Sequence, residues 1–137
     1  EPGAVWAAAH EDINLITLLV EATEPGLEIQ RRDGSWLPIT PVPGQMIVDT
    51  GDMMQRLTNG RIPATTHRVL APPSATGPRF SIPFFVHPHP DFLIRPLSSC
   101  QASTDEGLAP ITARSYLAER LRENNVLTVD IAVDEID

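Results

Sequence analysis

The chain has 137 residues, a size typical of one domain that can bury a core. Hydrophobic residues make up 42% of it, and no apolar run approaches the roughly eighteen residues that a membrane-spanning helix needs. We therefore expect no membrane partner, and the formal net charge of -8 argues against nucleic acid as a partner, because phosphate binding favours a basic surface. Cys100 is the single cysteine, which excludes an internal disulfide and favours a reducing, cytoplasmic location.

The first part of the chain is typical of short strands separated by turns. Residues 5–12 predict a first strand, and residues 15–21 predict a second, buried one. Residues 27–32 alternate between apolar and polar side chains, as expected of a strand with one buried face. Asp33-Gly34 then predicts a two-residue hairpin turn, with Trp36 starting the return strand.

The pattern of short strands continues after residue 45. A β-branched run at 46–48 is followed by a segment at 53–58 that ends at the turn signal Asn59-Gly60. Residues 67–70 and 80–86 complete the set of predicted strands. Many short strands with turns between them are typical of a β-sandwich or a jelly roll.

One helix is predicted, near the end of the chain. Pro110 ends the preceding element, and Thr112 suits the N-cap position. An apolar stripe at four-residue intervals follows, formed by Ala113, Leu117 and Leu121. We expect this helix to pack on the outside of a barrel in a structural role. Residues 126–133 alternate again, so their apolar face needs a partner: they could replace an edge strand or pair with another chain.

Three residues form a candidate metal site. Along a strand, His10 and Asp12 project to the same face while Glu11 faces away. His67, far downstream, could fold back beside this pair. Two imidazoles and one carboxylate form the facial triad of non-heme Fe(II) oxygenases, which leaves the other positions of the ion open. Each of these residues alone is more often a packing or surface residue, so the prediction rests on their joint occurrence.

A second cluster follows His67 after a short interval. Read as a strand, it places Arg79, Ser81, Pro83 and Phe85 on one face. An arginine can hold a carboxylate through two parallel charge-assisted hydrogen bonds, and a hydroxyl beside it adds a third donor. The sequence therefore predicts a carboxylate anchor next to the metal site.

Together the two clusters resemble the Fe(II)- and 2-oxoglutarate-dependent dioxygenases, in particular their isopenicillin N synthase-like branch. The residues that carry the resemblance occur in the family's order at 10–19, 33–36, 43–44, 51–60, 66–69 and 79–85. The match covers most of the chain and is more specific than any single motif. It implies a mainly β fold, a double-stranded β-helix or jelly roll with one C-terminal helix.

The resemblance also implies a chemistry. His10, Asp12 and His67 correspond to the family's iron ligands, and 2-oxoglutarate would occupy two further positions of Fe(II). Family members oxidise a small molecule with O2, most commonly by hydroxylation, and release succinate and CO2 from the cosubstrate. A metal site of this composition suits a dry cavity because the charges of the ion, Asp12, the cosubstrate and Arg79 cancel.

The anchor strand departs from the family at one position. The resemblance assigns Arg79 and Ser81 to the distal carboxylate of 2-oxoglutarate and Phe85 to the border of the primary substrate. Between Arg79 and Ser81 the family commonly has a tyrosine, where this chain has Phe80. Because Phe80 faces the opposite side of the strand, we expect the cosubstrate site to survive the change.

The first candidate ligand occurs unusually early in the chain for a member of this family. His10 lies close to the start of the chain, whereas family members carry a long helical and β-stranded half upstream. We therefore expect a catalytic part that lacks the family's N-terminal half, with a jelly-roll core at 1–110 and a helix and strand-like tail at 111–137. A second chain or the missing N-terminal segment could complete the barrel.

Two other classes of function stay open. A cupin-like, metal-binding jelly roll without oxygenase turnover is compatible with His67, but cupins usually carry His-x-His where this chain has His-x-Asp. An inactive fragment that serves only association is the other alternative. Asp49 and Asp52 are interpreted as strand-ending residues, with support of a ligating histidine as the less favoured role for them.

Overall fold

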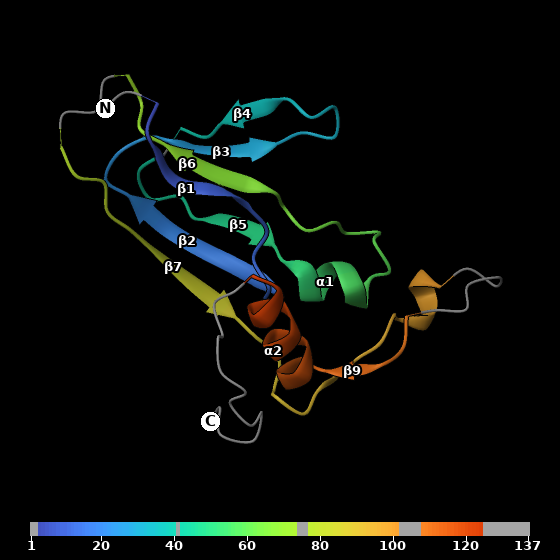
Figure 1. Cartoon of the computed structure of the whole chain (residues 1–137). Coiled ribbons are helices and arrows are strands. Elements are labelled where there is room, and N and C mark those ends of the chain that lie inside the picture. Colours follow the sequence, from blue (N-terminus) through green and yellow to red (C-terminus); the bar gives the residue numbers. More distant parts are fainter. Residues whose placement is uncertain (1–2, 41, 74–76, 102–107, 125–137) are drawn as a thin grey trace.

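The structure is a computed structural model that describes residues 3–40, 42–73, 77–101 and 108–124 (Figure 1). Its strands are β1 (Val5–His10), β2 (Ile16–Ala22), β3 (Leu27–Gln30), β4 (Trp36–Pro38), β5 (Ile47–Thr50), β6 (His67–Leu70), β7 (Ser81–Val86), β8 (Leu93–Ile94) and β9 (Ile111–Thr112). The helices are α1 (Asp52–Leu57), the 3-10 helix η1 (Ser98–Cys100) and α2 (Ala113–Glu123). None of the helices in these ranges is long and apolar enough to cross a membrane.

Two antiparallel sheets face each other. One has the strand order β1-β6-β3-β4 and the other the order β5-β2-β7, so most consecutive strands of the chain alternate between the sheets. Figure 1 shows the sheets as two layers, with α1 and α2 at one end of them. Alternation of strands between two facing sheets is the arrangement that the predicted jelly roll requires.

Side chains of the second sheet alternate between the space inside and the outer surface. Leu18, in the central strand β2, has Val48 and Phe84 as its cross-strand partners, and these two are 56% and 63% exposed. The preceding residue, Thr17, is 5% exposed and has Asp49 and Phe85 as its partners. The period of two therefore directs Thr17, Asp49 and Phe85 into the space between the sheets.

The β3–β4 hairpin is confirmed, but its turn is longer than predicted. Arg31 N–H donates to Ser35 O, and Gly34 N–H donates to Arg31 O. These bonds leave three residues between Arg31 and Ser35, with Gly34 at a φ of +83°. A type I turn followed by a left-handed glycine is a common three-residue hairpin loop, so the Asp-Gly pair indicated the hairpin but not its length.

Residues 53–58 are mostly helical, so the structure contains a short helix that the sequence pattern did not predict, in addition to the predicted C-terminal one. Helix α1 begins at Asp52 after the extended residue Gly51. Met53 is completely buried in a cluster with Ile94 and Ala113, and Leu57, one helical turn later, packs against the same cluster. A segment of this length holds too few apolar residues for its period to distinguish a helix from a strand.

The C-terminal helix is confirmed as α2, with the predicted N-cap: the Thr112 hydroxyl accepts a hydrogen bond from Ser115 N–H at 3.2 Å. Ala113 of α2 shares the buried cluster with Met53 of α1, so this cluster joins residues from both sides of residue 110. The division at residue 110 stays a prediction. The strand-like tail at 126–133 lies outside the described residues.

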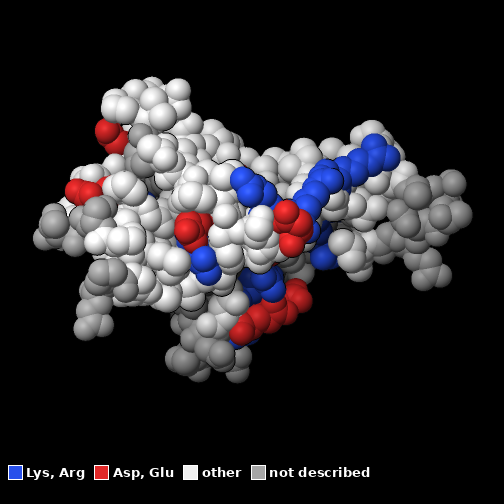
Figure 2. All heavy atoms as spheres, turned by 90° about the horizontal axis from the view of Figure 1, so that it is seen from above, with Lys and Arg blue, Asp and Glu red and all other residues white. Residues whose placement is uncertain are grey.

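Acidic and basic side chains lie next to one another on the face seen in Figure 2. On the outer side of the first sheet, Arg68 Nη2 is 2.7 Å from Glu28 Oε2, and its guanidinium lies 4.0 Å from the centre of the Trp36 ring. Stacking and pairing of this kind suit an arginine at a protein surface.

Candidate metal centre and carboxylate pocket

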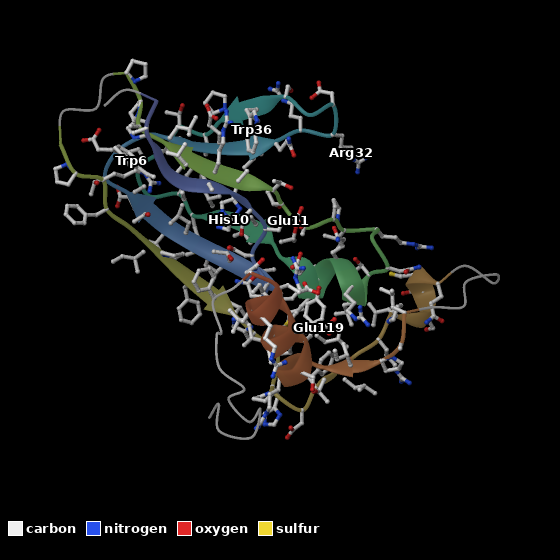
Figure 3. All side chains as sticks on the ribbon, viewed as in Figure 1. Trp6, His10, Glu11, Arg32, Trp36 and Glu119 are labelled. Carbon is white, nitrogen blue, oxygen red and sulfur yellow. The ribbon has the colours of Figure 1, made fainter. Side chains whose placement is uncertain are left out.

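The two histidines of the predicted metal site lie opposite each other in the first sheet. His10, the last residue of β1, pairs with His67, the first residue of β6, and their ring centroids are 4.3 Å apart. The register of these strands shifts twice: Val5 pairs with Leu70, so β1 covers five residue steps where β6 covers three. Bulges of this kind redirect side chains near functional sites. Figure 3 shows His10 at the end of β1, in the space between the sheets.

Asp12 completes the cluster from a loop. The sequence had predicted a strand over residues 5–12, so that part of the prediction is wrong for Asp12. The strand ends at His10, and the chain then turns towards β2. Asp52 N–H, at the start of α1, donates to Asp12 O at 2.8 Å and fixes this loop. Asp12 Oδ1 is 3.6 Å from His10 Nε2 and 4.0 Å from His67 Nε2. The loop thereby brings the carboxylate between the imidazoles.

Hydrogen bonds to the backbone determine which ring nitrogen each histidine can offer. Nδ1 of His10 lies 2.7 Å from Ala8 O, and Nδ1 of His67 lies 3.0 Å from Thr65 O. A carbonyl oxygen only accepts hydrogen bonds, so both Nδ1 atoms carry the proton in the neutral rings. The lone pairs therefore reside on the Nε2 atoms, which face Asp12, and this is the tautomer that a metal ligand needs.

The three residues fit a divalent ion. One ligand atom from each lies within 4.8 Å of the others. Ligands about 2.1 Å from one ion are about 3 Å apart at a right angle, so these separations must contract by at most about 2 Å to close the site around a metal. The Asp12 and His67 side chains are 10% and 12% exposed, whereas His10 is 47% exposed. Glu11 takes no part, because its Oε1 accepts a hydrogen bond from the Thr66 hydroxyl.

A cavity between the sheets joins this cluster to the predicted carboxylate anchor. It is lined by His10, Asp12, Thr17, Leu19, Leu27, Ile47, Asp49, His67, Val69, Arg79, Ser81, Pro83 and Phe85. The predicted face of the anchor strand thus lines one wall, and Phe80 is 65% exposed on the other side. The sequence pattern therefore located the candidate ligands and the anchor face of the cavity, but not the contribution of β2 and β5 through Thr17, Ile47 and Asp49.

Arg79 lines the cavity and donates two hydrogen bonds within the protein. Its Nη1 donates to Ser81 Oγ at 2.9 Å and its Nε to Glu24 O at 3.1 Å. Burial lowers the pKa of Arg79, yet a guanidinium stays charged at neutral pH. Because no acidic side chain among the described residues forms an ion pair with Arg79, its charge remains available to a carboxylate ligand.

A second hollow reaches the metal cluster from the side of α2. Phe85 lines both hollows, and the other residues of the second are His10, Glu11, Asp12, Ile13, Asn14, His87, Leu117, Leu121 and Asn124. Partial burial lowers the pKa of His87. Leu117 and Leu121 of α2 line this hollow, and Leu117 also packs against the buried cluster of Met53, Ile94 and Ala113. The external, structural role of α2 stays a prediction.

Asp49 is a further carboxylate beside the metal cluster, and support of a ligating histidine was the less favoured prediction for it. Asp49 Oδ2 is 3.8 Å from His67 Nδ1, and the Asp49 side chain is 17% exposed. Burial raises the pKa of Asp49, while the His67 imidazole opposes that shift. Its inward direction on β5 follows from the register with Thr17, which the sequence alone does not supply.

Comparisons with known proteins agree with this geometry. A family model described as the 2OG-Fe(II) oxygenase superfamily matches residues 1–88. Gibberellin 3-beta-dioxygenase 2 of Arabidopsis thaliana is 35% identical over 123 residues, which are 89% of this chain and 35% of that protein. The 2-oxoglutarate-Fe(II) type oxidoreductase hxnY of Emericella nidulans is 37% identical over 111 residues, or 80% and 31% of the two chains. The chain thus spans about a third of the length of these curated relatives.

A solved structure shows the same architecture. A full-length Neurospora crassa protein, in complex with alpha-KG and thymine, superposes with a TM-score of 0.82 at 32% identity, covering 90% of this chain and 39% of that one. The jelly-roll fold class is thereby confirmed, and the His-Asp-His set fits the Fe(II) in the family's name. This chain belongs to the 2OG-Fe(II) oxygenase superfamily.

Proposed function

We propose that this chain carries the catalytic centre of an Fe(II)- and 2-oxoglutarate-dependent oxygenase that oxidises a small molecule, most simply by hydroxylation. The observation that carries the proposal is that one cavity holds both a His-Asp-His cluster and an arginine whose charge is available beside a neighbouring hydroxyl. The proposed metal ligands are His10, Asp12 and His67. When bound, Fe(II) and 2-oxoglutarate supply oxidising power from O2 as the cosubstrate becomes succinate and CO2.

The residues of the anchor strand have separate proposed tasks. Arg79 and Ser81 bind the distal carboxylate of 2-oxoglutarate. The guanidinium attracts it by charge, and the hydroxyl orients it through a directional hydrogen bond. Phe85, between the two hollows, borders the primary substrate. Apolar walls from Leu19, Ile47 and neighbouring residues exclude water, which strengthens these polar contacts.

Further features of the proposal rest on the sequence. The order of the motifs supports placement in the isopenicillin N synthase-like branch. The single cysteine, Cys100, supports a cytoplasmic location, and the net charge of -8 supports a small molecule over nucleic acid as the substrate. A metal-binding module without turnover is the second candidate, and it predicts metal binding without succinate formation under O2.

Binding of 2-oxoglutarate tests the anchor. Calorimetric titration with 2-oxoglutarate in the presence of Mn(II) should give strong binding that becomes much weaker without metal. Arg79→Ala should weaken it about 10- to 100-fold, because a hydrogen bond to a charged group contributes about 1.5–3 kcal/mol. Arg61→Ala, a change of an exposed arginine, is the matched control.

Glutarate, which has both carboxylates but no keto oxygen, separates chelation from anchoring. It should bind more weakly than 2-oxoglutarate and gain less from Mn(II). Equal binding of 2-oxoglutarate with and without metal, or an Arg79→Ala protein that binds as well as the Arg61→Ala protein, would overturn the proposed arrangement.

A further inference from the structure

Two polar side chains beyond the candidate ligands form a hydrogen-bonded chain that ends on Asp12. The Thr17 hydroxyl donates to Asp12 Oδ2 at 2.5 Å and accepts from Asn14 Nδ2 at 2.8 Å. Asn14 is 1% exposed and Thr17 is 5% exposed. The other oxygen, Asp12 Oδ1, faces the Nε2 atoms of His10 and His67. The two oxygens of one carboxylate thus have different surroundings.

The direction of these hydrogen bonds follows from the groups involved. Thr17 has one hydroxyl proton and the Asn14 Nδ2 group can only donate, so this proton goes to a carboxylate. Asp12 Oδ2 is its partner at 2.5 Å, with Asp49 as the competing neighbour. With the amide turned round, Asn14 Oδ1 and Asp12 Oδ2 would compete for that one proton. The observed orientation avoids the competition, although Asn14 Oδ1 then has no hydrogen-bond partner within the described part of the chain.

Both supporting residues are held firmly. Thr17 lies in the central strand of its sheet, paired with Asp49 on one side and Phe85 on the other. Asn14 O accepts from Met53 N–H at 3.1 Å, and a Cβ at Gly51 would lie only 2.5 Å from Asn14 Oδ1. The chain of hydrogen bonds therefore starts from packed backbone and ends at the candidate metal ligand.

We propose that Thr17, supported by Asn14, is a positioning residue that makes Asp12 a one-oxygen ligand. This inference rests on the proposed function, in which Asp12 binds the metal. Occupation of Oδ2 by the hydroxyl directs Oδ1 to the position between the imidazoles and disfavours binding through both oxygens. The coordination position that a second carboxylate oxygen would occupy stays open for other ligands.

Metal affinity tests the first part of the inference. Fe(II) is titrated calorimetrically into the full chain without oxygen and without 2-oxoglutarate. Thr17→Val, which keeps the shape of the side chain but removes the donor, should weaken Fe(II) binding about 10- to 100-fold. Thr17→Ser should restore most of the affinity because it restores the hydroxyl. Thr58→Val removes another buried hydroxyl, one bonded only within residues 54–62, and should leave Fe(II) affinity unchanged.

Whether Asp12 binds through one oxygen or two is tested by the visible absorption spectrum of the Co(II)-loaded chain. This spectrum responds to the coordination number and geometry of the metal. The Thr17→Val spectrum should differ from that of the unmodified chain, and the Thr17→Ser spectrum should match it. Asn14→Leu should weaken metal binding less than Thr17→Val. Because Asn14 acts through Thr17, the double variant Asn14→Leu/Thr17→Val should bind no more weakly than Thr17→Val alone.

Asp12→Ala separates failure of this inference from failure of the proposed function. If Asp12→Ala binds Fe(II) as the unmodified chain does, the proposed metal site is wrong. If Asp12→Ala loses the metal while Thr17→Val retains both full affinity and an unchanged Co(II) spectrum, the metal site stands and the positioning role is refuted. Equal losses in Thr17→Val and Thr58→Val would also refute it, since a general loss of stability would then explain the effect.

Discussion

Each histidine of the proposed metal site uses one ring nitrogen for the backbone and leaves the other for an ion. The bonds from His10 to Ala8 O and from His67 to Thr65 O span only two residues. The side chains are thereby oriented by the same short segments of chain that carry them. Asp12 is oriented instead by Thr17, from a different element. The carboxylate therefore depends on a contact with strand β2, whereas the imidazoles depend on the backbone beside them.

Ser81 provides a test at the scale of one hydroxyl group. It accepts a hydrogen bond from Arg79 and can donate its own proton to a carboxylate. Ser81→Ala should weaken 2-oxoglutarate binding about 2- to 12-fold, as expected for loss of one hydrogen bond of about 0.5–1.5 kcal/mol. The loss should be smaller than that of Arg79→Ala in calorimetric titrations with Mn(II). A larger effect of Ser81→Ala than of Arg79→Ala would contradict the proposed division of tasks.

Among the elements, the junction of β5 and α1 contacts the loop that carries Asp12. Gly51 N–H donates to Leu15 O and Asp52 N–H to Asp12 O, so the first turn of α1 binds the loop that carries Asp12. A Cβ at Gly51 would lie 2.4 Å from Asn14 O and 2.6 Å from Asp12 O. The glycine is required here by close approach of two backbone segments, since its φ of -104° is accessible to any residue.

Gly51→Ala should therefore destabilise the fold and displace Asp12. We expect a decrease of about 1–3 kcal/mol in the free energy of unfolding, the range typical of overpacking, together with weaker Fe(II) binding. Urea denaturation followed by circular dichroism measures the first effect and anaerobic calorimetry the second. Gly77→Ala is the matched control, because a Cβ there meets no atom within 4 Å. Equal stability of the two variants would show that the loop tolerates displacement at this junction.

For the molecule as a whole, local sequence patterns predicted the strands and the residues proposed for the site. The distances between those residues depend on how the strands pair, which local patterns do not give. Alternation placed Arg79, Ser81 and Phe85 on one face, and they line one cavity. The helix α1 was missed because its apolar residues are too few to define a period. The sequence did not indicate Asn14 or Thr17, and it favoured a strand-ending role for Asp49. The surroundings of these residues depend on the pairing of β2 with β5 and on the contact with Gly51.

The central claim is that Asp12, with two histidines, holds Fe(II) beside a 2-oxoglutarate anchor. It is tested most directly by adding Fe(II) and 2-oxoglutarate to the protein without oxygen and recording the visible charge-transfer band of the chelated complex. We predict a band for the unmodified chain that Asp12→Ala abolishes and that Asp33→Ala, a change of a carboxylate in the β3–β4 turn, leaves intact. Arg79→Ala should need more 2-oxoglutarate to reach the same absorbance. Absence of the band with both ligands saturating, or its persistence in Asp12→Ala, would contradict the account.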